Sequence, residues 1–210
     1  NTGQIIRGSM GIEDADIDAT QPWDLHTGNL GTLTLAIIDS GVNSHVEFTG
    51  RLLPGRNTAN PLTPNLTTDS CPHGTHVAGI AAAEGNNSVG VAGITWGANI
   101  LPVRVLTGCS GVVSSLADGI VWAADQGAHV GNISLQYYEL PPEQVTLLQN
   151  AVDYAHDQGM LLVAATGNGR PAGSIAYPAR LANTMAVGGT TNRDEVATTA
   201  TAGWISNTGA

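Results

Sequence analysis

The sequence contains no lysine, few charged residues and no long apolar run, and these absences argue against two classes of partner. Its 210 residues include 7 arginines and 17 acidic side chains, which give a formal net charge of −10 at neutral pH. A basic surface for phosphate backbones is therefore missing, and nucleic acid is not an expected partner. No apolar run approaches the roughly 20 residues that cross a bilayer, so we expect no membrane partner either.

Cysteine is also scarce, with only Cys71 and Cys109. The two are too far apart for a CxxC redox motif and too few for a zinc knuckle. Their spacing leaves two interpretations equally open: one disulfide in an oxidising compartment, or two buried free thiols.

Apolar residues, in contrast, make up 42% of the chain, a share typical of a compact globular protein. We find no repeat and no linker, and so expect residues 1–210 to form one domain. Apolar runs that read as strands cover Leu33–Asp39, Ala98–Leu106, Ala128–Leu135, Met160–Thr166 and Thr184–Thr191. Segments with helical spacing cover His73–Ala83, Ser114–Gly127 and Pro142–Gly159. Strands that are apolar throughout, alternating with helices, predict an α/β fold: a doubly wound parallel sheet with helices on both faces.

Two histidines, His73 and His76, head the segment "HGTHVAGIAAA". Their spacing is compatible with metal binding, with catalysis by one of them, or with two ordinary side chains. Asp39, Ser134 and Asn168 follow or end predicted strands, where such sheets gather functional groups. Taken singly, Asp39 and Asn168 are ordinary turn residues. Together, a carboxylate, an imidazole and an amide suit acyl transfer, because they orient a base, remove a hydroxyl proton and stabilise an oxyanion.

Three stretches resemble the sequence blocks of the subtilisin-like serine proteases, the subtilases: "AIIDSGV", "HGTHVAGIAA" and "VAATGN". The resemblance runs from about Ile17 to the last residue and is closer to the proteinase K and aqualysin branch, on the segment "SHVEFTGR" and the two cysteines. It implies a subtilisin-like fold. The "GTSMA" block that carries the family's nucleophile is missing, so we expect a peptidase domain that is incomplete at its C-terminus.

The resemblance implies a role for each matching residue. Asp39 would orient His73, the general base, Asn168 would donate to the oxyanion, and His76 would be structural. No Glu separates the two histidines and no third ligand follows, which disfavours a metal-dependent hydrolase. The implied substrate-binding residues are Ser110 and Gly111 at one cleft edge, Ser134 and Leu135 at the other, and Ala165, Thr166 and Gly167 in the pocket for the residue before the scissile bond.

The same resemblance suggests two structural features and two departures. It implies a disulfide between Cys71 and Cys109. The stretch "NNSVGVAG" is similar to a calcium loop, with Glu47, Asn87 and the carbonyls of Val89 and Val91 as ligands; a metal-free turn is the alternative. Pro72 and Gln136 stand where the family usually has glycine, and the bulk of Gln136 is expected to restrict the cleft.

The expected function is a secreted, extracellular serine endopeptidase that uses an Asp-His-Ser triad whose serine lies beyond this chain. The alternative is a catalytically inactive subtilase-like module that binds extended peptides. Protein or peptide substrates are the expected partners, with a propeptide inhibitor as a further one, and we expect a monomer.

Overall fold

The computed structural model describes residues 5–6, 9–10, 12, 15, 17–28, 33–169, 175–198 and 206–207. In chain order, the strands are β1 (Ile5–Ile6), β2 (Ser9–Met10), β3 (Thr34–Asp39), β4 (Arg56–Asn57), β5 (Asn99–Arg104), β6 (Val130–Ile133), β7 (Leu161–Ala165) and β8 (Thr184–Val187). The helices are α1 (Thr20–Leu25), α2 (Gly74–Ala82), α3 (Val113–Asp125) and α4 (Pro142–Asp157), with a short 3₁₀ helix at Val46–Phe48. The expected domain limits at residues 1 and 210 lie outside the described residues.

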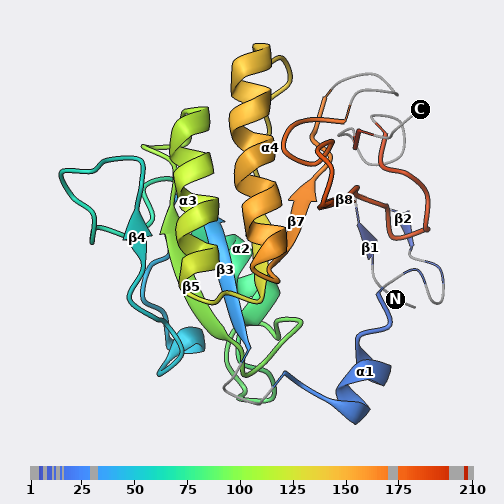
Figure 1. The fold of residues 1–210 in the computed structure, drawn as a ribbon. Helices are drawn as coiled ribbons and strands as arrows, with labels where there is room; N and C mark the ends of the chain where they lie inside the picture. Colours follow the sequence, from blue (N-terminus) through green and yellow to red (C-terminus); the bar gives the residue numbers. More distant parts are fainter. Residues whose placement is uncertain are drawn as a thin grey trace.

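Six strands form one parallel sheet in the order β4-β5-β3-β6-β7-β8, while β1 and β2 pair separately as an antiparallel hairpin. Helices α3 and α4 lie side by side over one face of the sheet, and α2 lies behind the other face (Figure 1). The predicted doubly wound α/β fold is therefore confirmed.

The two faces of the central strand β3 explain why its sequence is a continuous apolar run. Ala36 and Ile38 belong to the core formed with α3 and α4, whereas Leu35 and Ile37 belong to the core formed with α2. Because the strand is covered on both sides, none of these positions tolerates a polar side chain without a partner.

Some short elements escaped the sequence analysis. Strand β4 has only two residues, Arg56 and Asn57, and pairs with β5 at the edge of the sheet. Neither residue is apolar, so no hydrophobic pattern marks the strand. Helix α1 contains no buried residue, and for that reason it also lacks an apolar stripe.

No helix in the described part of the chain combines the length and the apolar character that a bilayer-spanning segment needs.

Candidate active site

Asp39 and His73 form a hydrogen-bonded pair at the carboxyl edge of the sheet. Asp39 is the last residue of β3 and its side chain is fully buried, while the His73 side chain is 46% exposed. His73 Nδ1 lies 2.8 Å from Oδ1 and 2.9 Å from Oδ2 of Asp39. A carboxylate only accepts hydrogen bonds, so the proton of the neutral ring sits on Nδ1 and leaves Nε2 as an acceptor. No hydroxyl group in the described residues bonds to Nε2.

Glycine is needed where α2 starts, because the helix must come very close to the end of β3. A Cβ atom on Gly74 would lie 2.2 Å from the carbonyl oxygen of Gly41 and 3.1 Å from Asp39 Cβ. Any larger residue at position 74 would push His73 away from the carboxylate. The first Gly of "HGTH" is therefore a packing requirement of the pair.

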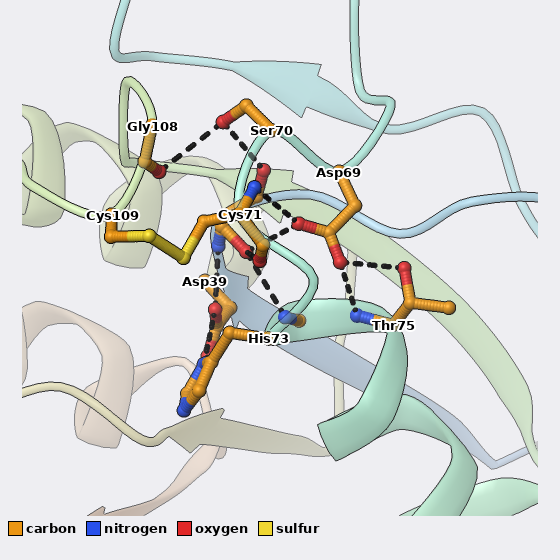
Figure 2. The surroundings of a disulfide bond; sticks show 10 residues. Asp39, Asp69, Ser70, Cys71, His73, Thr75, Gly108 and Cys109 are labelled. Atoms are coloured by element: carbon orange, nitrogen blue, oxygen red, sulfur yellow. Dashed lines mark hydrogen bonds and ion pairs between the residues drawn. A yellow bond between two sulfur atoms is a disulfide. The ribbon is translucent and has the colours of Figure 1, made fainter.

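A second carboxylate, Asp69, lies in the loop before His73 and joins this loop to Ser40, which follows β3, and to Thr75 in α2 (Figure 2). One oxygen accepts hydrogen bonds from Ser40 Oγ at 2.7 Å and from the Cys71 backbone N–H at 3.0 Å. The other accepts from the backbone N–H and hydroxyl of Thr75, at 2.8 and 2.7 Å. Burial acts to raise the pKa of Asp69, but the hydrogen bonds from Ser40 and Thr75 outweigh it, and the net pKa is lowered.

The sequence analysis did not predict that Asp69, Ser40 and Thr75 form one hydrogen-bonded group. Ser40 Oγ also accepts the N–H of Gly74 at 3.0 Å, so one hydroxyl joins the residue after Asp39 to the residue after His73. The only signal was an acidic residue four positions before His73, within a polar loop that held several equally plausible polar residues.

The disulfide implied by the resemblance is present, and the interpretation of two free thiols is wrong. Cys71 and Cys109 are bonded with a Cα–Cα distance of 5.1 Å. The bond links the loop before His73 to the loop after β5, and Ser70 Oγ reinforces the link by donating to Gly108 O at 3.3 Å (Figure 2). The loop that carries the imidazole is thus fixed covalently and by hydrogen bonds.

Residues from both expected edges of the substrate cleft line one cavity. Ser110 and Gly111, in the loop after β5, line a cavity of about 200 Å³ together with Leu135, which follows β6. Tyr137 closes part of this cavity, because its hydroxyl donates to Gly111 O at 3.2 Å. Ser134, at the expected second edge, accepts a hydrogen bond from Asn132 Nδ2 at 3.0 Å.

Asn168 lies in the turn after β7, and the strands that precede Asp39, Ser134 and Asn168 are direct neighbours in the sheet. The side chain of Asn168 is exposed, whereas Thr166 and Gly167 are buried and Ala165 is partly buried. The Asn168 backbone N–H donates to Gln136 Oε1 at 2.8 Å. Asp39, Ser134 and Asn168 therefore lie at the same edge of the sheet, as predicted from their places at the strand ends. No hydrogen bond joins Asn168 to His73 in the described residues.

The hydroxyl groups of two serines near the ends of the described strands, Ser134 and Ser206, bond to groups other than His73. Ser134 is held by Asn132, and Ser206 is 5% exposed, where its Oγ accepts the Gly189 N–H at 2.8 Å. Neither hydroxyl has a hydrogen bond to His73 in the part of the chain that is described.

The two histidines of the "HGTH" block lie in different environments. His73 faces Asp39, whereas His76 lines a cavity of about 600 Å³ together with His45, Phe48 and Ile80. No three side chains of the metal-binding types His, Cys, Asp and Glu gather anywhere in the described residues.

Glu47 and the loop that carries Asn87 are adjacent, as the calcium prediction requires. Glu47 is 3% exposed, and its Oε2 accepts from Asn87 Nδ2 at 2.9 Å. Its other oxygen, Oε1, has no hydrogen-bond partner among the described residues and points at Gly90, where a Cβ would lie only 2.2 Å away. Asn87 Oδ1 accepts the Val89 N–H at 3.0 Å, and Val91 lines the same cavity as Glu47.

These residues fit a hard cation, because a buried carboxylate oxygen without a partner is costly unless a charge or a donor neutralises it. The amide of Asn87 directs its nitrogen to Glu47, so coordination through Oδ1 requires the amide to turn over.

The chain matches known proteins along most of its length. Residues 31–209 match the model of the subtilase family. Thermitase from Thermoactinomyces vulgaris is 41% identical over 194 residues, 90% of this chain and 65% of that protein. Subtilisin Savinase from Lederbergia lenta is 45% identical over 157 residues, 74% of this chain and 55% of that protein.

Solved structures agree with the sequence matches. A protease from Pseudoalteromonas arctica superposes with a TM-score of 0.72 at 29% identity, covering 81% of this chain and 59% of that one. Sphericase gives 0.68 at 34% identity, covering 78% and 55%. The chain thus spans about half the length of several relatives that it matches, and 39% of an alkaline protease from Shouchella clausii. The closer likeness to proteinase K and aqualysin stays a prediction.

Proposed function

Because the chain belongs to the subtilase family, we propose that it supplies the acid, the base and the oxyanion donor of a serine endopeptidase. The observation that carries the proposal is the contact of the His73 ring with both oxygens of the fully buried Asp39 carboxylate. A buried carboxylate that accepts a hydrogen bond from Nδ1 of a half-exposed histidine is the arrangement that orients a catalytic imidazole.

In the proposed reaction, Asp39 holds the imidazole in the tautomer with the proton on Nδ1. His73 Nε2 then removes the proton of a serine hydroxyl as that oxygen attacks the peptide carbonyl, and the same nitrogen later protonates the leaving amine. The Asn168 side-chain amide would donate to the oxyanion that forms, in a role whose removal elsewhere costs about 10²–10³-fold in kcat. We propose that this serine belongs to the whole protein and lies outside these 210 residues.

The substrate is proposed to be an extended segment of protein or peptide. It would lie between the Ser110–Gly111 edge and the Ser134–Leu135 edge, where strand addition provides main-chain hydrogen bonds. The side chain before the scissile bond would enter between Leu135 and the wall formed by Ala165, Thr166 and Gly167. The cavity shared by Ser110, Gly111 and Leu135 supports this path.

We propose an extracellular location, which the disulfide supports because such bonds persist in oxidising compartments. Calcium is proposed as a structural ion held by Glu47, Asn87 and the carbonyls of Val89 and Val91. When bound, it would neutralise the buried Glu47 charge and stiffen the loop. The propeptide inhibitor and the monomeric state remain predictions.

A serine-directed fluorophosphonate tests the proposed function on the complete natural protein. We expect stoichiometric labelling, loss of casein hydrolysis after labelling, and no labelling when His73→Ala is introduced. Casein hydrolysis that persists after full labelling would contradict the mechanism. Tight peptide binding with no hydrolysis would instead favour the inactive binding module.

A further inference from the structure

Gln136 spans the gap between two segments that the proposed function assigns to the substrate pocket. It follows Leu135 in the segment after β6, and its side chain reaches the turn after β7. There, Oε1 accepts the backbone N–H of Asn168 at 2.8 Å. The side chain therefore bridges the cleft edge at Leu135 and the pocket wall that ends at Gly167.

The Gln136 amide is held in this position by a second group. The hydroxyl of Tyr138 lies 2.9 Å from Gln136 Oε1 and 2.8 Å from the carbonyl oxygen of Asn168. The Asn168 N–H also points at this hydroxyl, at 3.1 Å. Gln136, Tyr138 and the Asn168 backbone thus form one interlocked set, in which moving any member breaks bonds of the others.

The amide also rests directly on the backbone of the pocket wall. A Cβ placed on Gly167 would lie 3.0 Å from Gln136 Oε1, so the oxygen is in contact with the space that a side chain at 167 would fill. Gly167 has a φ of +100°, which favours glycine and leaves no side chain at this position. Gln136 shares the space around Gly167 with Asn207 Nδ2, which would lie 2.8 Å from that Cβ, and with Ala176 Cβ, which would lie 3.0 Å from it.

We propose that Gln136 is a specificity-determining residue that excludes large side chains from the pocket before the scissile bond. The inference rests on the proposed function and names its substrates: peptides with glycine, alanine or serine at that position. A larger side chain has to displace the Gln136 amide and break its bond to the Asn168 N–H. That displacement disturbs the same turn that presents the proposed oxyanion donor, so the penalty falls on kcat as well as on KM.

The test compares two tetrapeptide p-nitroanilides that differ only in alanine or phenylalanine before the cleaved bond, using the complete protein. The wild type is expected to prefer alanine by at least about tenfold in kcat/KM, the scale of one methylene in a tight pocket. Gln136→Ala should remove or reverse that preference. Gln136→Glu keeps the size and the acceptor oxygen, and should keep the preference for alanine even if both rates fall.

The exposed residue Gln158, which lies beyond α4 at the opposite end of the sheet, provides a matched control. Gln158→Ala should leave the ratio of the two kcat/KM values unchanged. A wild type that prefers phenylalanine, or a Gln136→Ala variant with an unchanged ratio, would overturn the inference while leaving the peptidase function intact.

Calorimetry on product-like peptides with a free C-terminal alanine or phenylalanine separates the two failures. A wild type that cleaves neither substrate contradicts the proposed function. In that case, tighter binding of the alanine peptide, lost in Gln136→Ala, still supports the exclusion by Gln136, and equal binding of both peptides overturns it.

Discussion

Among the described residues, two carboxylates are buried, those of Asp39 and Glu47, and they differ in how fully their oxygens are hydrogen-bonded. Asp39 is fully buried, and its oxygens accept the His73 ring nitrogen and, at 2.6 Å, the Ser40 N–H. Glu47 is 3% exposed, yet Oε1 has no hydrogen-bond partner among the described residues. One carboxylate is satisfied by the chain itself, and the other is satisfied only in part.

The difference agrees with the two roles proposed above. A fully satisfied acid at the end of a strand orients another side chain, and here that side chain is an imidazole. A buried acid with an unused oxygen costs free energy unless a cation or a hydrogen-bond donor neutralises it. The loops follow the same division, since a disulfide fixes the loop before His73 and no covalent bond within the described residues fixes the loop at Asn87.

The largest effect should come from breaking the Asp39–His73 pair. Asp39→Asn is expected to lower kcat about 10⁴-fold, the known cost of this exchange in a Ser-His-Asp triad, because the amide stabilises the wrong imidazole tautomer. The measurement is steady-state hydrolysis of a peptide amide by the complete protein. Asp118→Asn, at an exposed position of α3, is the matched control and should retain full activity. An Asp39→Asn enzyme with more than a tenth of wild-type kcat would contradict the assignment.

The next effect concerns the disulfide that fixes the His73 loop. Replacing both Cys71 and Cys109 with serine should lower the free energy of unfolding by about 3–4 kcal/mol, because the bridge closes a loop of 38 residues. Urea unfolding followed by circular dichroism measures the change. A reductant should bring the wild type to the value of the variant and leave the variant itself unaffected. Equal stability of the oxidised wild type and the variant would show that the bond stabilises nothing.

A smaller effect is expected at Glu47. A chelator should lower the unfolding free energy of the calcium-loaded wild type by about 3 kcal/mol, the linkage expected at 100-fold saturation. Glu47→Gln should not respond to the chelator, because the amide removes the charge that attracts the ion. The exposed acid Glu143 offers a control, since Glu143→Gln should respond as the wild type does. An identical chelator response in Glu47→Gln would place the ion elsewhere, and no chelator response in the wild type would exclude it.

The smallest effect should come from Asp69, which secures the start of α2. Asp69→Asn is expected to cost about 1 kcal/mol at pH 7, the usual value of a side chain that caps a helix. The folded pKa is below the unfolded value of 3.8, so this stabilisation is complete above that value and is lost as pH falls through the folded pKa.

Unfolding curves of wild type and Asp69→Asn should therefore converge in acid. Asp24→Asn, at an exposed position of α1, is the matched control and should leave the unfolding free energy at pH 7 unchanged. A difference between wild type and Asp69→Asn that grows as the pH is lowered would reverse the proposed sign.

Most of the sheet was predictable because burial on both faces requires continuous apolar runs, as in β3. Strand β4 was not, since its two residues are polar and only their pairing with β5 defines it. The "HGTH" block drew attention to His73, but nothing in the local sequence distinguished Asp69 from its polar neighbours. Its partners Ser40 and Thr75 lie 29 and 6 positions away and approach only in the folded chain.

The sequence by itself determined the order of strands and helices and the chemical groups that follow each strand, because periodicity and residue type are local properties. Only the tertiary structure decided that both oxygens of Asp39 are hydrogen-bonded, that Glu47 keeps an oxygen without a partner among the described residues, and that Gln136 reaches the turn after β7. Those outcomes depend on distances between segments far apart in the chain, and packing sets these distances to within a fraction of an ångström.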